Sequence, residues 1–496
     1  MGYLRVVALL LPVVWLAACP SQAQHRFDIP ALDPLADITV PDPQPNTAPQ
    51  YLGRDPWRIT RPQSPQPPAP QQAPANDVSP WEACVRAPDA SAALAYCTEF
   101  AQDEDQPAAR RAEAFLARAR AHEVQNQTVA AIADLTAALE LNPKWPTAFH
   151  RRGVLWTHER NFDQAIKDFS AALALSPRSL EFFVARGVAY RGKKDSARSI
   201  ADFDRALAIN PRSELAYYER GLTKLDAGDY AGATADLEKA LELNPRLALA
   251  QFAHGNVQYA QRNIKAAIVS YDKAVRLDPS IEYYVSNARG VAKFEIGDCN
   301  GAIDDFSRAL AINERSPGTF RNRGTCLVKR GKFEDAIVDF TRAIYITPDS
   351  ADLFAERGSA FLYNRDLVTA RRDINHALKL DAKNAAALRA RARLRLIEHD
   401  LPGALTDLNA SLSHKFSDDA LSERIWFHIV ANDLDQARQD IRDVLARNPA
   451  DPSALFARGY LKMKAGDQIS GKQDMVEAVQ RDHDLVPRLE FYGLKF

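Results

Sequence analysis

A recurring arginine and a recurring aspartate are the residues of this chain best placed to do chemistry. Arg186 precedes Gly187, Asp202 precedes Phe203 sixteen residues later, and the arrangement returns about every 34 residues. A row of arginines could bind phosphates or nucleic acid, whereas arginines that are each paired with an acid could hold a scaffold together. The two interpretations differ in what should happen where one partner is absent.

The repeats themselves decide between these interpretations. The arginine recurs as Arg118, Arg152, Arg186, Arg220, Arg289, Arg323, Arg357, Arg391, Arg424 and Arg458. The aspartate recurs as Asp134, Asp168, Asp202, Asp236, Asp305, Asp339, Asp373, Asp407, Asp440 and Asp474. One repeat has His254 and Ser270 instead, so base and acid are lost together. Joint loss is expected of an ion pair, because an unpaired half-buried charge is costly, and we therefore interpret the arginines as scaffold.

The elements that must position these pairs are helices. Small residues and a closing proline recur with the same period of about 34 residues. The glycines are Gly153, Gly187, Gly221, Gly255, Gly290, Gly324 and Gly358. Glycine allows two backbones to approach closely, and proline cannot continue a helix, so each repeat is predicted to be an antiparallel helix pair. A single pair cannot bury its apolar face, so the pairs must stack into a solenoid.

This spacing, with its small residues and closing proline, resembles the tetratricopeptide repeat. Eleven units begin near residues 112, 146, 180, 214, 248, 283, 317, 351, 385, 418 and 452, and they cover about three-quarters of the chain. The resemblance implies an all-α fold, a right-handed superhelical solenoid over residues 112–484 with a tail at 485–496. Two units have Ala392 and Ile425 in place of glycine, so their packing is expected to differ.

The first residues predict export. Arg5 precedes an apolar run at 6–18 that is too short to span a membrane comfortably, so residues 1–23 are predicted to be a signal peptide. Two cleavage sites remain open. LAAC at 16–19 resembles a bacterial lipobox and would lipidate Cys19 as a membrane anchor, whereas SQA would direct ordinary cleavage after residue 23. The expected location is the bacterial periplasm.

Between the signal and the repeats the composition changes twice. Residues 20–80 are rich in proline and are predicted to be a disordered linker. Residues 81–111 are predicted to be a short helical cap whose two arms carry Cys84 and Cys97. A disulfide between these cysteines would staple the cap and contribute about 3 kcal/mol to its stability.

The remaining residues indicate no catalytic or metal site. Cys299 and Cys326 could form a second disulfide in an oxidising compartment, or remain two buried thiols. No phosphate-binding loop, GxSxG or HExxH motif occurs, and the ten histidines are scattered. The 63 basic and 64 acidic side chains nearly cancel, which argues against a nucleic-acid partner. We expect neither an enzyme nor a cofactor.

Binding of another protein is the expected function. In tetratricopeptide proteins the first helix of each unit lines the concave face, so the resemblance places a groove at Tyr218, Leu222, Leu225, Phe252, Tyr259, Tyr284, Val291 and Phe294. Such a groove suits an extended peptide or a partner helix. The alternative is that several of these residues complete the core. The expected role is an interaction scaffold in the bacterial envelope, and the alternative is a periplasmic subunit that regulates an envelope enzyme in trans.

Overall fold

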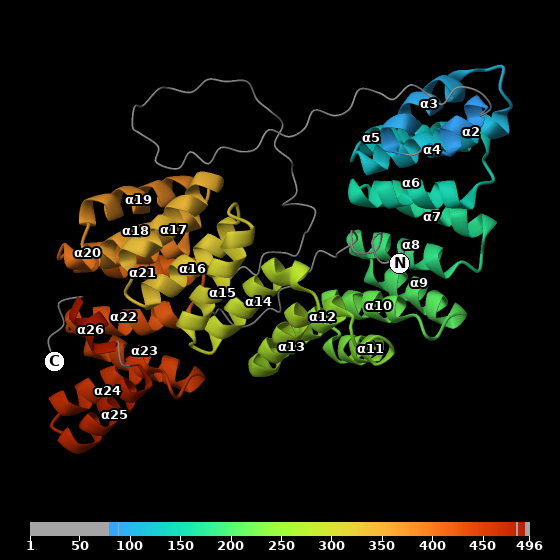
Figure 1. Ribbon diagram of the computed structural model, residues 1–496. Helices are drawn as coiled ribbons and strands as arrows, with labels where there is room; N and C mark the ends of the chain where they lie inside the picture. The colour runs from blue at the N-terminus through green and yellow to red at the C-terminus, as the bar shows by residue number, and fades with distance from the viewer. Residues whose placement is uncertain (1–78, 88, 483–484, 492–496) are drawn as a thin grey trace, which may run out of the picture. The chain divides into compact units, whose positions relative to one another are not determined.

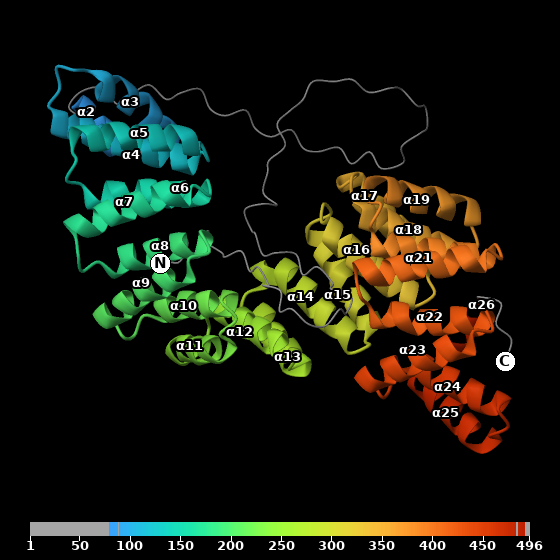
Figure 2. The same cartoon turned by 180° about the vertical axis from the view of Figure 1, so that it is seen from behind.

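The computed structural model describes residues 79–87, 89–482 and 485–491, which form helices and no strands (Figure 1). The chain divides into two compact units at residues 243 and 244, and each is considered by itself. In both units consecutive helices pair and the pairs stack in chain order, as Figure 2 shows from behind. The prediction of an all-α stack of helix pairs is confirmed.

The N-terminal unit begins with a short cap followed by four helix pairs. Its helices are α2 (Pro80–Val85), α3 (Ala90–Gln102), α4 (Ala108–Val124), α5 (Thr128–Leu141), α6 (Pro146–His158), α7 (Phe162–Leu175), α8 (Leu180–Gly192), α9 (Ser196–Ile209), α10 (Glu214–Asp226) and α11 (Tyr230–Leu243). Ser79 caps α2 by accepting a hydrogen bond from the backbone N–H of Glu82. The cap therefore starts at the last residues of the predicted linker.

The C-terminal unit holds the remaining pairs. Its helices are α12 (Ala248–Ala260), α13 (Ile264–Leu277), a 3₁₀ turn η1 (Pro279–Ile281), α14 (Glu282–Glu295), α15 (Cys299–Ile312), α16 (Pro317–Lys329), α17 (Phe333–Ile346), α18 (Ala351–Tyr363), α19 (Leu367–Leu380), α20 (Ala385–Ile397), α21 (Leu401–His414), α22 (Asp418–Val430), α23 (Leu434–Arg447), α24 (Pro452–Lys464), α25 (Gln468–Arg481) and α26 (Leu485–Phe491). The last helix lies in the predicted tail, and its Leu485 and Leu489 are buried in the apolar cluster of the final pair.

Each pair turns through one residue in the left-handed conformation. These residues are Asn126, Arg160, Lys194, Gly228, Arg262, Gly297, Gly331, Arg365, His399, Asn432 and Gly466. The next residue is often an aspartate that caps the second helix, as Asp195 does by accepting a hydrogen bond from the backbone N–H of Arg198 at 3.0 Å. Capping satisfies a helix N–H group that would otherwise lack a partner, so the turn chemistry of each repeat starts its second helix.

The two helices of a pair meet where the glycine faces an aromatic ring. A Cβ atom at Gly187 would lie only 2.8 Å from Cε1 of the buried Phe203. Three repeats lack this glycine and keep their helix pairs. They have Ala119, Ala392 and Ile425, which come with Leu135, Leu408 and Ile441, all smaller than the phenylalanine that four of the glycine repeats have at that position. The larger residue at the glycine position is thus accompanied by a smaller residue sixteen positions later.

Candidate partner-binding surface

The arginine–aspartate pairs are parts of the scaffold, as their joint loss indicated. Arg186 donates from Nε and Nη2 to the two carboxylate oxygens of Asp202, at 2.8 Å each. Its Nη1 donates to Ser170 of the preceding repeat at 3.1 Å. The hydrogen bonds to Asp202 raise the pKa of Arg186, although burial alone would lower it. In the repeat that lacks the pair, Ser270 donates to Gln258 instead, so no carboxylate is left without its base there.

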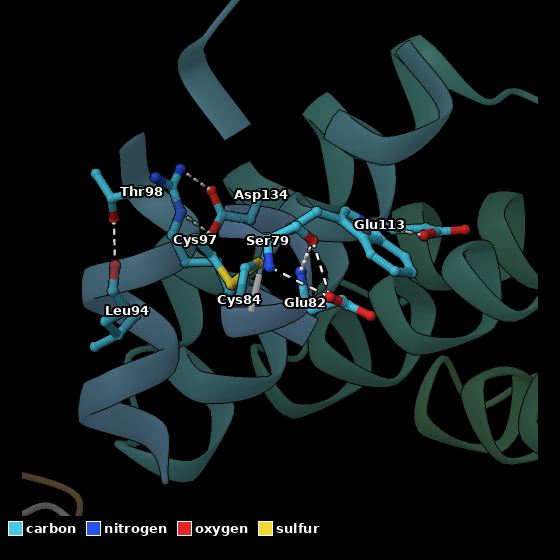
Figure 3. The surroundings of a disulfide bond; sticks show 10 residues. Ser79, Glu82, Cys84, Leu94, Cys97, Thr98, Glu113 and Asp134 are labelled. Atoms are coloured by element: carbon cyan, nitrogen blue, oxygen red, sulfur yellow. Dashed lines mark hydrogen bonds and ion pairs between the residues drawn. A yellow bond between two sulfur atoms is a disulfide. The ribbon is translucent and has the colours of Figure 1, made fainter. Parts of the chain in front are cut away.

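The cap contains the predicted disulfide. Cys84 of α2 and Cys97 of α3 are bonded to one another (Figure 3). Both are buried in an apolar cluster with Phe100, and Trp81 packs against this cluster. The disulfide therefore joins the two helices of the cap, which the spacing of the cysteines predicted.

The second predicted disulfide is absent. Cys299 and Cys326 are free thiols, which corrects the expectation of a bridge and agrees with the alternative of two thiols. Cys326 is buried and Cys299 is half-buried at the first residue of α15. A hydrogen bond between the two thiols lowers the pKa of Cys299 to about 6, and the nearby cations of Lys329 and Arg330 act in the same direction.

The first helices of neighbouring repeats lie against one another within each unit, and we call the surface that they form the first-helix face. In the N-terminal unit the predicted groove residues Tyr218, Leu222 and Leu225 all belong to α10 and are buried, with Tyr218 only 5% exposed. Burial raises the pKa of the Tyr218 hydroxyl, so this side chain stays neutral. These side chains thus contribute to packing.

The predicted groove residues of the C-terminal unit are less uniform. Phe252, Val291 and Phe294 are buried, and the ring centroid of Phe252 lies 5.5 Å from that of Tyr271 in the core. Tyr259 and Tyr284 are only partly buried, and the hydroxyl of Tyr259 donates to Glu295. Burial favours the alternative that most of the predicted groove residues complete the core. Their role in binding stays a prediction, and the two tyrosines are the better candidates for it.

Ion pairs between neighbouring repeats also lie on the first-helix face, and they were not predicted from the sequence. In the C-terminal unit Arg393 donates to both carboxylate oxygens of Glu423, at 2.5 and 3.0 Å. Arg321 likewise donates to Glu356 at 2.7 Å. In the sequence these ion pairs are indicated by a glutamate at the sixth residue of the first helix, where several other repeats have alanine. Each acid faces an arginine of the preceding repeat.

One such pair, in the N-terminal unit, has a second carboxylate beside it. Nη2 of Arg191 in α8 lies 3.0 Å from Oε2 of Glu219 in α10. Asp226, the last residue of α10, interacts electrostatically with both of them. We call these three residues the charge cluster. Burial raises the pKa of Glu219 despite Arg191. Burial also raises the pKa of Asp226 to about 7; Arg191 opposes this shift and Glu219 adds to it.

Two other kinds of site concern the residues that the structure describes. No group of three or more His, Cys, Asp or Glu side chains in this part of the chain could hold a metal ion. None of the described helices combines the length and the apolar character that a membrane crossing requires.

Comparison with known proteins identifies the repeats. Family models described as tetratricopeptide repeat match residues 155–214, 187–258, 248–281 and 428–468. A tetratricopeptide repeat protein from Parabacteroides merdae is 20% identical, over 47% of this chain and 93% of that chain, with a TM-score of 0.41. Yeast Tom70 is 13% identical, over 77% of this chain and 96% of that chain, with a TM-score of 0.41. YrrB, described as a tetratricopeptide repeat protein with an unusual peptide-binding site, is 23% identical, over 38% of this chain and 97% of that chain, with a TM-score of 0.34. No curated protein sequence matches the chain.

Proposed function

Because the chain is a tetratricopeptide repeat protein, we propose that it is a non-catalytic scaffold that binds protein partners through the first helices of its repeats. A stack of repeats supports this proposal because it offers an extended surface to which each first helix contributes side chains. Such a surface suits an extended peptide or a partner helix.

One observation carries the proposal. The packing positions of the repeats are nearly constant, whereas the first-helix position three residues before the glycine changes in chemical character from repeat to repeat. That position is occupied in turn by His150, Val184, Tyr218, Phe252, Asn287, Arg321, Ala355, Arg389 and Ser422. Val184, Tyr218, Phe252, Asn287, Ala355 and Ser422 are buried and belong to the packing, whereas His150, Arg321 and Arg389 are partly exposed. The variation that a partner could recognise therefore lies at these three side chains, and such variation is what specific recognition requires.

We propose the bacterial envelope as the setting. The support comes from the sequence alone, since the predicted signal peptide, Cys19 and most of the proline-rich linker lie outside the described residues. The proposal of an exported scaffold therefore combines a binding surface that can be tested by substitution with a location that can be tested by fractionation.

The binding surface is tested with tyrosines of two different faces. The protein would be used to capture partners from detergent-solubilised envelope of the organism that produces it. Replacing Tyr259 and Tyr284 by alanine should remove the specific partners, because aromatic anchors dominate interface energetics at about 2 kcal/mol or more each. The matched control is Tyr345→Ala on the second helix α17, where the side chain is 87% exposed, and it should leave capture unchanged.

Thermal melts of the same proteins separate binding from folding. Tyr259 and Tyr284 are only partly buried, so their loss should cost less stability than that of Phe252, which packs on Tyr271. Undiminished capture by the double variant would contradict the first-helix assignment. Capture of a single dominant enzyme, whose activity the protein changes, would favour a regulatory subunit over a scaffold.

A further inference from the structure

Two free thiols of the C-terminal unit lie at one junction between repeats. Cys299 is the first residue of α15, the second helix of one repeat, and Cys326 lies in α16, the first helix of the next repeat. Cys326 belongs to a buried apolar cluster with Phe294 and Phe306, and Cys299 packs against that same cluster. Cys326 is 0% exposed, whereas Cys299 is half-buried, so solvent reaches the pair from the side of Cys299.

The surroundings of Cys299 favour its thiolate form. The hydrogen bond with Cys326 is the largest cause that lowers the pKa of Cys299 to about 6, and burial opposes it. The charges of Lys329 and Arg330 add to the lowering, while that of Asp298 opposes it. Cys299 also begins a helix, and helix N-termini stabilise thiolates. The hydrogen bond and burial raise the pKa of Cys326, so the proton of the pair stays on the buried sulfur.

This arrangement differs from that of the disulfide in the cap. Cys84 and Cys97 are 1% and 0% exposed, so their bond is closed to reagents in solvent. A redox-reactive cysteine has a low pKa, is accessible, and has a second thiol beside it that displaces the first adduct. Cys299 meets the first two conditions, and Cys326 supplies the third.

Two exposed cations beside this pair determine which reagent is favoured. Nζ of Lys329 lies 4.0 Å from the ring centroid of Phe294, in the same apolar cluster as Cys326. Arg330 follows directly, and both cationic side chains are exposed. With Asp298 as the one acid that acts on the Cys299 thiol, the local charge is positive. A positive site raises the local concentration of anions and their rate of encounter.

We propose that Cys299 and Cys326 form a redox-active dithiol that reduces an anionic, low-molecular-weight disulfide. The thiolate of Cys299 attacks one sulfur of that disulfide, forms a mixed disulfide and releases the first thiolate. The thiol of Cys326 then attacks the sulfur of Cys299, and its proton passes to the second departing thiolate. Cys299 and Cys326 become bonded to one another, and two electrons have passed from the pair to the small disulfide. This site goes beyond the proposed scaffold function and does not depend on it.

Glutathione disulfide is the probe for the two steps. The full chain is first reduced and freed of reductant, and peptide mass mapping then locates every adduct. The unsubstituted protein should gain a bond between Cys299 and Cys326. Cys326→Ala lacks the thiol that displaces glutathione, so glutathione should accumulate on Cys299. Cys299→Ser should gain neither product at this pair. Equivalent positions of other repeats have Ala360 and Ser196, and thermal melts confirm that both variants fold.

The preference for an anionic disulfide is measured as a ratio of rates. Cystamine, which carries two ammonium groups, is the cationic comparison. Replacing Lys329 and Arg330 by glutamine should lower the rate with glutathione disulfide, relative to that with cystamine, by about tenfold. Replacing the exposed Lys379 and Lys383 by glutamine changes the net charge equally and should leave the ratio unchanged.

The outcomes separate this site from the scaffold function. Absence of glutathione on Cys299 in the Cys326→Ala variant, or reaction at Cys326 in Cys299→Ser, would overturn the proposed dithiol. An equal ratio of rates in all three proteins would overturn the choice of an anionic disulfide. Each of these results would leave partner capture by the first helices standing, because capture is measured with other residues.

Discussion

Seven of the ten recurring arginines make two connections, one within the repeat and one to the preceding repeat. Arg186 holds Asp202 of its own repeat with two hydrogen bonds and Ser170 of the preceding repeat with a third. The first connection could be predicted, because base and acid disappear together in one repeat. The second could not, since its acceptor is Ser170 here, but Thr136 and Asp204 at other junctions. A position occupied by serine, threonine, aspartate or asparagine shows no constant pattern in the sequence.

The pairing can be measured at the same residues. Arg186→Ala and Asp202→Ala should each lower the free energy of unfolding, and the double variant should cost less than the sum by about 0.5–3 kcal/mol. Chemical denaturation of the four proteins gives this coupling. The exposed pair Lys239 and Glu242 serves as the control, and its coupling should be near zero. Strictly additive losses at Arg186 and Asp202 would mean that the two side chains do not interact.

Asp226 should make stability depend on pH. Burial raises its pKa to about 7 in the folded protein, so between about pH 4 and pH 7 the folded state keeps a proton that the unfolded chain has lost. The free energy of unfolding contributed by this group therefore falls as pH rises through that range. Asp226→Asn should reduce the fall, as measured by urea denaturation at several pH values. Glu219, whose pKa is also raised by burial, should cause part of the fall to remain in the Asp226→Asn variant. An unchanged pH profile would contradict the placement of Asp226.

Helices pair through a match of sizes that the sequence shows only in part. The period and the prolines predict every pair, and Ala119, Ala392 and Ile425 mark the repeats without the glycine. How those repeats pack depends on Leu135, Leu408 and Ile441, which lie sixteen positions later and are smaller than phenylalanine. The burial of Tyr218 was not predictable from the period, because it depends on how neighbouring first helices lie against one another within the unit.

The size match predicts a rescue. Gly187→Ala should destabilise the protein by about 1–3 kcal/mol, because the added Cβ would lie 2.8 Å from the ring of Phe203. Adding Phe203→Leu should restore part of the loss, since it recreates the small partner that accompanies Ala392. Thermal or urea denaturation of the single and double variants measures both steps. A double variant less stable than either single one would rule out size compensation.

Over the whole molecule, the sequence was sufficient for the repeats and insufficient for the charge cluster. Repeats are read from a regular period, and the helices agree with it from α4 to α25. Glu219 stands at the same first-helix position as Glu356 and Glu423, but its partner Arg191 comes from a different position of the preceding repeat, so only the structure brings the two together. The helix α26 was missed because it is short and follows the last repeat.

The setting of the molecule can be tested at the predicted anchor. If Cys19 is lipidated, Cys19→Ala should move the protein from the membrane fraction to the soluble periplasmic fraction. Cell fractionation followed by immunoblotting measures this change. Unchanged membrane association would contradict the lipid anchor, while secretion of the mature protein after cleavage at residue 23 would still be compatible with an exported scaffold.

The double connection made by most of these arginines also bears on how such a chain can change its length. Arg323 reaches back to Ser307 and Arg357 reaches back to Thr341 in the same way, exactly one repeat apart. Unequal recombination that removed or duplicated the 34 residues between them would join Arg357 to Ser307, or repeat the existing contact, and either junction would again have a hydroxyl acceptor. Gene copies of different length can therefore fold without any compensating mutation, and the length of the binding surface becomes a trait on which selection can act.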